Sequence, residues 1–389
     1  MTKEEKIGQL FFPAVFIHDT EAGIREIETL IKNHCVGGLT FFYSRESVET
    51  NFDRKKTVTQ HLNSVAKLKE MVAHYQQLSK YPLLISIDAE WGLGMRIAAF
   101  PAFPYPLTLS ATNNEKLIFE VGKAIAQELK SVGIHQNLAP VVDINNNPKN
   151  PVIGYRSFGE HREVVVQNAW AYYQGMQSEN ILGCLKHFPG HGDTAVDSHL
   201  GLPVLNKSVQ ILRENELFPF NELIKKGIDC IMTGHLAVPQ LSGNQLPASI
   251  CKEMIDFLRT DLAYQGAIIT DALNMKGVAS EFEAGELELK ALEAGNDMLS
   301  FSKNIAKGIA LIGKKVSEER IEESFQKIQR LKEKAGLFSS LKNTPKIVDE
   351  NTHYILRNKI AESAITSVKR TDKALITVKK MFLFRYLKK

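Results

Sequence analysis

Short runs of β-branched and aromatic residues alternate with helix-length segments along most of the chain, and this alternation constrains the fold more than any other feature. Strands that are separated by helices pair in parallel, because each connection has to cross the sheet before the next strand begins. Eight such repeats over about 300 residues are typical of a (β/α)8 barrel, so we predict an α/β protein of this type. The runs span residues 9–12, 38–42, 83–87, 136–138, 183–185, 230–232, 267–270 and 297–301.

A doubly wound open sheet is the alternative fold, since it also alternates strands with helices. Its usual sign is a glycine-rich phosphate loop between the first strand and the first helix. No such loop follows residues 9–12, and the barrel is therefore favoured.

Two helices are indicated by apolar residues that recur at helical spacing. The first covers residues 115–130, and Thr112 stands three residues before Glu115, which is the spacing of a capping box. The second covers residues 318–334 and ends at Gly336, which suits the position after a helix C-terminus.

Composition argues against several classes of protein. The chain has 389 residues, 44% of them hydrophobic, and a formal net charge of +4. No basic face interleaved with aromatic residues appears before the C-terminus, so no nucleic-acid partner is expected. No apolar stretch approaches the roughly 18 residues that cross a bilayer, and residues 1–6 lack the apolar segment of a secretory signal. We expect a monomer in the cytoplasm, or in the periplasm if a signal peptide has been removed.

The four cysteines lie far apart in the sequence and are expected to be reduced packing residues: Cys35, Cys184, Cys230 and Cys251.

The alternation of strands and helices ends after Gly336, so we predict a barrel over residues 1–337 and a C-terminal extension over residues 338–389. Within the extension, residues 354–368 are helix-like. Residues 379–389 mix apolar and basic side chains, which suits either a packed or frayed terminus or a short membrane-surface tail.

Residues 185–199 are the most polar stretch that directly follows an apolar run, and they hold three histidines, two aspartates, a lysine and two glycines. In a (β/α)8 barrel the active site collects such residues from the C-terminal ends of several strands. Together these groups donate to and accept from hydroxyls, which suits a neutral, hydroxyl-rich substrate, and no cofactor motif competes with that interpretation. Polar residues follow the third to seventh strands: Asp88 and Glu90, Asp143 and Arg156, Lys186 and His187, His235, and Asp271.

Asp271 is the candidate nucleophile, because it ends an apolar strand and its carboxylate can attack an anomeric carbon to form a covalent glycosyl intermediate. His199 is the candidate acid and base. Asp197 stands two residues before it, close enough in a tight loop to orient the imidazole and favour its charged form.

Metal binding is the alternative for this loop, although its residues lack helical i, i+4 pairing. The residues of a metal-ligand type are His187, His191, Asp193, Asp197 and His199. His191 and Asp193 also suit a structural role in fastening the loop.

The motifs around these residues resemble those of the β-N-acetylglucosaminidases of glycoside hydrolase family 3. The resemblance covers roughly residues 4–337 and rests on ordered motifs at residues 4–10, 186–194, 197–199 and 269–275. It implies a (β/α)8 barrel that removes terminal N-acetylglucosamine with retention of configuration, typically from peptidoglycan fragments, without a cofactor or metal. It assigns Asp271 as nucleophile and His199 with Asp197 as acid and base. The resemblance further implies that five residues hold the sugar's hydroxyls: Asp88, Arg96, Arg156, Lys186 and His187.

Two departures from the family pattern affect what the resemblance implies. Glu90-Trp91-Gly92 replaces the usual Glu-Gly-Gly step, so an indole is expected at the rim. Many relatives continue into a second α/β domain, and residues 361–366 are similar to its start, so the extension resembles a truncated second domain. Two other functions remain open: a phosphorylase that uses the same residues with phosphate as acceptor, and a non-catalytic sugar-binding barrel.

Overall fold

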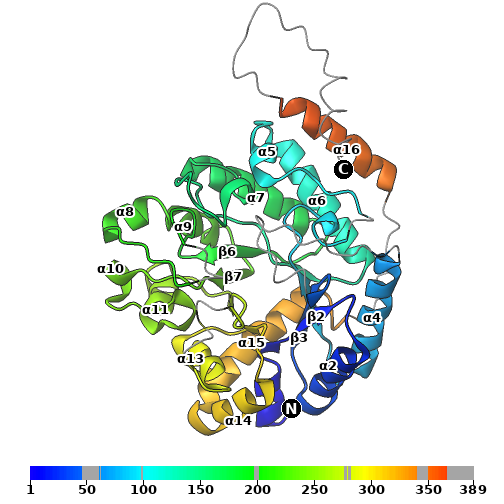
Figure 1. Cartoon of the computed structure of the whole chain (residues 1–389), viewed down its shortest axis with the longest axis vertical. Coiled ribbons are helices and arrows are strands. Elements are labelled where there is room, and N and C mark those ends of the chain that lie inside the picture. Colours follow the sequence, from blue (N-terminus) through cyan, green and yellow to red (C-terminus); the bar gives the residue numbers. More distant parts are fainter. Residues whose placement is uncertain are drawn as a thin grey trace, which may run out of the picture.

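The computed structural model describes residues 1–45, 61, 63–97, 100–196, 201–275, 278, 282–339 and 349–365. Figure 1 shows a ring of helices around a central set of strands, with the N-terminal segment beside α14 and α15, and α16 at the other end of the view. The strands are β1 (Phe11–Phe12), β2 (Ala14–Phe16), β3 (Gly38–Phe42), β4 (Leu84–Ile87), β5 (Gln136–Asn137), β6 (Cys184–Phe188), β7 (Cys230–Thr233), β8 (Ala267–Thr270) and β9 (Leu299–Ser300).

The strands of the described residues close into a barrel in which every pairing is parallel. They form the orders β2-β3-β4-β5, β6-β7-β8 and β1-β9. Only Pro13 separates β1 from β2, and because proline has no N–H to donate, the two pieces make one interrupted strand. Two single bridges join β5 to β6 and a third joins β8 to β9, through Gln136–Leu182, Val141–Lys186 and Ile269–Met298. The predicted (β/α)8 fold is confirmed.

The helices that surround the barrel follow the strands in the order expected for this fold. The α-helices are α1 (Lys3–Gly8), α2 (Glu21–His34), α4 (Ser64–Leu78), α5 (Pro106–Ser110), α6 (Glu115–Ser131), α7 (Arg162–Gln177), α8 (Val209–Glu214), α9 (Phe218–Ile224), α10 (Pro239–Ser242), α11 (Lys252–Thr260), α13 (Glu286–Ala294), α14 (Ile305–Lys315), α15 (Glu318–Lys334) and α16 (Glu350–Ser363). Short 3₁₀ turns are η1 (Leu93–Met95), η2 (Gly154–Arg156) and η3 (Ala248–Ile250).

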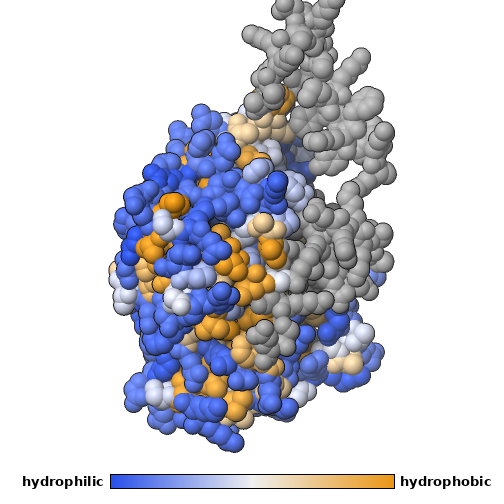
Figure 2. Space-filling model, turned by 60° about the vertical axis from the view of Figure 1, so that its left-hand side comes forward, coloured by the Kyte–Doolittle hydropathy of each residue, from blue (hydrophilic) through white to orange (hydrophobic). Residues whose placement is uncertain are grey.

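The helices bury one face each and leave the other to solvent. In α11, Met254, Ile255, Phe257 and Leu258 are buried while charged residues lie between and around them. The face with α8, α10 and α11 comes forward in Figure 2, where it is mainly hydrophilic with scattered apolar groups. Helices α6 and α7 cross closely because glycines stand at the crossing. A Cβ on Gly122 would lie 2.2 Å from the Tyr172 carbonyl oxygen.

Local boundaries differ from the sequence predictions most at the first strand, which also resumes after residue 12 as β2, at the cap of α6 and at the end of β6. The first strand begins at Phe11 rather than at Gln9, which caps the C-terminus of α1. Helix α6 is capped by the Asn114 side chain, which accepts from the Leu117 N–H, so the capping role predicted for Thr112 was wrong. Strand β6 continues through Lys186 and His187 to Phe188, whereas the sequence placed both residues after the strand. The predicted helix over residues 318–334 is confirmed as α15, with Gly336 at a φ of 76°.

Helix α16 lies within the segment that was predicted as a C-terminal extension, and it packs against α6. The division of the chain at residue 337 stays a prediction, as does a truncated second domain. Residues 366–389, including the basic and apolar tail, lie outside the described residues. No helix in the described ranges is long and apolar enough to cross a membrane.

Helix α15 contacts the N-terminal ends of several strands, at the floor of the barrel. Three of its lysines reach residues that stand one or two positions before a strand. In each case a side chain from the last helix of the ring bonds to the start of a strand, so α15 ties distant strands together. The contacts are Lys327 with Asp297 at 3.4 Å, Lys332 with Gln9 at 2.6 Å, and Lys334 with Asp229.

Lys332 makes the stability of the barrel depend on pH. It is fully buried, it donates to the neutral amide of Gln9, and burial lowers its pKa from 10.5 to about 7. The unfolded chain keeps this proton up to the ordinary pKa, so the free energy of unfolding should rise by about 1.4 kcal/mol per pH unit above pH 7. Lys332→Met should remove that rise in urea unfolding at pH 7, 8 and 9. The exposed Lys314→Met should retain it, and a wild-type slope in Lys332→Met would contradict the assignment.

Candidate active site

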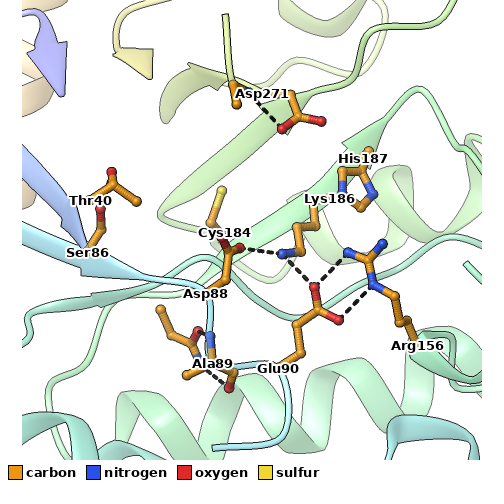
Figure 3. A network of polar contacts seen from close by, with 12 residues as sticks. Thr40, Ser86, Asp88, Ala89, Glu90, Arg156, Cys184, Lys186, His187 and Asp271 are labelled. Carbon is orange, nitrogen blue, oxygen red and sulfur yellow. Dashed lines mark hydrogen bonds and ion pairs between the residues drawn. The ribbon is translucent and has the colours of Figure 1, made fainter. Parts of the chain in front are cut away.

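The C-terminal ends of the strands bring most of the predicted site residues to one rim (Figure 3). Asp88 follows β4, Lys186 and His187 lie in β6, and Asp271 follows β8. Arg156 ends the η2 turn in the long segment after β5. The sequence prediction that these residues meet follows from the barrel, since all parallel strands end on the same side.

Lys186 is the centre of an alternating network of charges. Its Nζ lies 2.7 Å from Asp88 Oδ1 and 2.8 Å from Glu90 Oε1. Glu90 in turn receives two hydrogen bonds from Arg156, from Nε at 2.9 Å and from NH2 at 2.7 Å. Arg96 binds the other end, with its NH2 3.1 Å from Asp88 Oδ2. Three cations thus enclose two carboxylates, in the order Arg96, Asp88, Lys186, Glu90, Arg156.

Mutual pairing keeps the buried members of this network charged. Burial alone favours the protonated form of Glu90, but Arg156 and Lys186 hold its pKa well below the ordinary range. Burial also disfavours the ammonium of Lys186, and there Asp88 and Glu90 more than compensate and raise its pKa. The network therefore stays ionised at neutral pH and presents fixed donors and acceptors to a bound molecule.

Asp143 orients the histidines that follow on the same side. Its Oδ2 lies 2.7 Å from His187 Nδ1, and its carboxylate also accepts from the backbone N–H groups of His187 and His191. Burial favours protonation of Asp143, yet these histidines hold its pKa below the usual value. Because the carboxylate accepts from Nδ1–H, the other ring nitrogen of His187, Nε2, is left for a ligand.

His191 and Asp193 fasten the loop, in agreement with their structural alternative. His191 is buried, its Nδ1 lies 2.6 Å from Thr194 Oγ1, and burial lowers its pKa to about 4. Asp193 pairs with Lys207 at 2.5 Å. Among the described residues, no group of three or more histidine, cysteine, aspartate or glutamate side chains is arranged to hold a metal ion.

Asp271 is held at the end of β8 by its own backbone and its neighbours. Its N–H donates to the Thr233 carbonyl at 2.9 Å, and its Oδ1 accepts from the Ala272 N–H at 2.7 Å. The imidazole of His235 is buried behind this turn, with Nε2 3.0 Å from the Ala272 carbonyl oxygen. In Figure 3 Asp271 lies across the view from Glu90 and Arg156, with Lys186 and His187 between them.

The proposed acid and base, His199 and Asp197, lie outside the described residues, so their positions stay predictions. Conversely, Glu90 and Asp143 connect the site, although neither was assigned a role there. A signal was present for both, since each follows a strand. A single carboxylate after a strand, however, is usually a helix cap or a structural acid.

Trp91, the departure from the usual glycine, is almost completely buried. Its indole packs edge-on against Tyr105, with ring centroids 4.8 Å apart, and Tyr105 lies against Tyr155 at 4.3 Å. Tyr155 directly precedes Arg156. The indole therefore joins an aromatic cluster with Tyr105 and Tyr155.

Residues 2–331 match the N-terminal domain of glycosyl hydrolase family 3. β-Hexosaminidase LpqI of Mycobacterium tuberculosis is 30% identical over 77% of this chain and 72% of the relative. The chain belongs to glycosyl hydrolase family 3.

Other family 3 proteins are similar over most of the chain. β-Hexosaminidase A of Pseudoalteromonas piscicida is 34% identical, and the match covers 88% of this chain. The chain spans 61% of that relative and 65% of a Cellulomonas fimi β-N-acetylglucosaminidase/β-glucosidase. The structure of a family 3 β-N-acetylglucosaminidase from Paenibacillus sp. str. FPU-7 superposes with a TM-score of 0.83 at 31% identity, over 95% of this chain and 70% of that one.

Removal of the Glu90 carboxylate should destabilise this family 3 barrel strongly. Glu90→Ala leaves Lys186 and Arg156 buried with one carboxylate fewer, which typically costs about 3–5 kcal/mol of unfolding free energy. Asp256→Ala, which breaks the exposed Lys252–Asp256 pair, should cost much less. Urea unfolding of both variants measures the difference, and equal losses would show that the buried network contributes little.

Proposed function

We propose that the protein is a retaining exo-β-N-acetylglucosaminidase. One observation carries the proposal: a fixed network of charged donors and acceptors shares the barrel rim with Asp271, in a chain that belongs to glycosyl hydrolase family 3. The relatives of at least 30% identity quoted above are named β-hexosaminidases, which favours N-acetylhexosamine as the sugar.

Exposure within the network suggests how the sugar is held. The side chains of Asp88 and Arg96 are 17% and 15% exposed, against 2% for Glu90 and 3% for Lys186. Asp88 and Arg96 therefore face the substrate, and the buried members hold them in place. Further N–H donors come from Lys186 and Arg156, and a ring nitrogen comes from His187. The sugar's hydroxyls would therefore find both donors and acceptors.

The reaction would proceed in two displacements. The Asp271 carboxylate attacks the anomeric carbon while His199 gives a proton to the departing glycosidic oxygen, so the bond to the leaving group breaks as the bond to aspartate forms. Water then attacks the same carbon, His199 removes its proton, and the Asp271 ester is released. Asp197 would orient the imidazole. Two inversions at one carbon give net retention.

We infer that the substrates are small N-acetylglucosaminides derived from peptidoglycan, as the resemblance to the β-N-acetylglucosaminidases implies. The protein would act as a monomer, in the cytoplasm or in the periplasm if a signal peptide is removed. Neither a cofactor nor a metal has a step in this scheme.

Asp271 and His199 can be tested with an aryl β-N-acetylglucosaminide, which should release the aryl alcohol. Asp271→Ala should abolish the release, and His199→Ala should lower kcat by about 10²- to 10⁴-fold, because a general acid is lost. His74→Ala replaces an exposed histidine on α4 and serves as the control. Unchanged turnover in either of the first two variants would remove the role proposed for that residue.

The acceptor and the stereochemistry can be read from one NMR experiment on the released sugar. Hydrolysis with retention should yield the β-anomer first. A phosphorylase would instead yield sugar 1-phosphate when inorganic phosphate is added, and a histidine acid/base would not repel that anion as a carboxylate would. A related fold exists in a β-glucoside phosphorylase, at 24% identity and a TM-score of 0.84. Calorimetric binding of N-acetylglucosamine without any turnover would support a sugar-binding barrel instead.

A further inference from the structure

Helix α16 is attached to the barrel through few side chains, and one of them is a histidine. Tyr354 and Ile355 are 57% and 58% exposed, whereas His353 is 3% exposed and Ile360 is fully buried. Figure 1 shows α16 alongside α6. In the sequence, α16 lies well after β9, the last strand of the barrel. A buried imidazole at this junction needs a polar partner, and α6 provides it.

The partner is Glu128, a fully buried carboxylate near the C-terminal end of α6. Its Oε1 lies 3.2 Å from His353 Nδ1, and its Oε2 accepts from the Leu93 N–H at 3.0 Å. Burial raises the pKa of Glu128, and its hydrogen bonds to His353 and Leu93 oppose that effect. One carboxylate thus joins a helix that follows the barrel to a turn on its catalytic rim.

That turn is η1, which carries Arg96 immediately after it. The Leu93 carbonyl accepts from the N–H groups of Arg96 and Ile97, at 2.9 and 2.8 Å. Gly92 lies against Glu128, since a Cβ there would stand 2.9 Å from Oε2. Its φ of 91° also favours glycine at this position. The Arg96 guanidinium then reaches Asp88, with Nε 3.0 Å from the Asp88 carbonyl oxygen. The position of Arg96 therefore depends on a turn that Glu128 holds from behind.

We propose that His353 is a positioning residue for the sugar pocket. It holds Glu128 in the orientation that binds the Leu93 N–H, and this contact fixes the η1 turn and the approach of Arg96 to Asp88. The part of the proposal that concerns sugar affinity rests on the proposed function. The link from His353 through Glu128 to the Leu93 N–H does not rest on it.

The effect should appear in KM rather than in kcat, because Arg96 is placed where it would hold the sugar in the ground state and the transition state alike. His353→Ala removes the hydrogen bond that orients the buried Glu128 carboxylate, and part of that loss is expected to reach Arg96, so KM for an aryl β-N-acetylglucosaminide should rise about fivefold. His353→Gln keeps an N–H donor and should restore KM to within about twofold of the wild-type value. The exposed Tyr354→Ala on the same helix is the control.

Ile360→Ala separates this role from simple docking of α16, because it loosens the same helix without touching Glu128. The proposal requires a larger rise in KM for His353→Ala than for Ile360→Ala, with rescue only by glutamine at residue 353. Equal rises in both variants, or no rescue, would overturn it and assign the effect to helix packing.

Amide hydrogen exchange of the full-length protein tests the contact without any substrate. His353→Ala should speed exchange of the Leu93 amide about tenfold or more, since its acceptor is released, while His353→Gln should not. Unchanged protection in His353→Ala would overturn the proposal. If the wild-type protein hydrolyses no β-N-acetylglucosaminide, the proposed function fails, and the exchange result still decides whether His353 holds the turn.

Discussion

The buried ammonium of Lys186, held between Asp88 and Glu90, is the interaction on which the rim depends. Lys186 belongs to β6, and both carboxylates follow β4, so the pairing spans the intervening strand β5. Each of these charges would be costly to bury alone, and removal of one would leave its partners buried without full charge compensation. The charges of the rim therefore satisfy one another without a ligand, and Asp88 and Arg96 are more exposed than Glu90 and Lys186.

The same arrangement explains which parts of the fold were predictable from sequence. All eight strand positions were located, because a buried parallel strand is marked by a local apolar run bounded by polar residues. The end of β6 was misplaced for a tertiary reason. Lys186 and His187 have loop-like polarity, but partners from distant strands compensate their burial, and no local pattern records that. The cap predicted at Thr112 failed similarly, since Asn114 is also a capping residue type and only the path of the chain decides which one caps α6.

The site was predictable to the extent that barrel geometry alone dictates it. Once strands end on one side, Asp88, Lys186, His187 and Asp271 must share a rim, and the structure places them there. Glu90 and Asp143 were not assigned because their partners are other members of the site. A carboxylate that orients a neighbouring residue looks, in sequence, like any acid after a strand. The placement of His199 and Asp197 rests on motif resemblance, because the described residues end at Val196 and resume at Gly201.

Two helices that follow the last strand act on opposite ends of the barrel. Helix α15 reaches the strand starts with lysines, and each lysine meets an acceptor that stands just before a strand. Helix α16 reaches the rim with an imidazole, through Glu128 and the Leu93 N–H. The segments after β9 therefore contact both ends of the barrel. Under the role proposed for His353, the sugar pocket would depend on a residue far in sequence from the strands that form it.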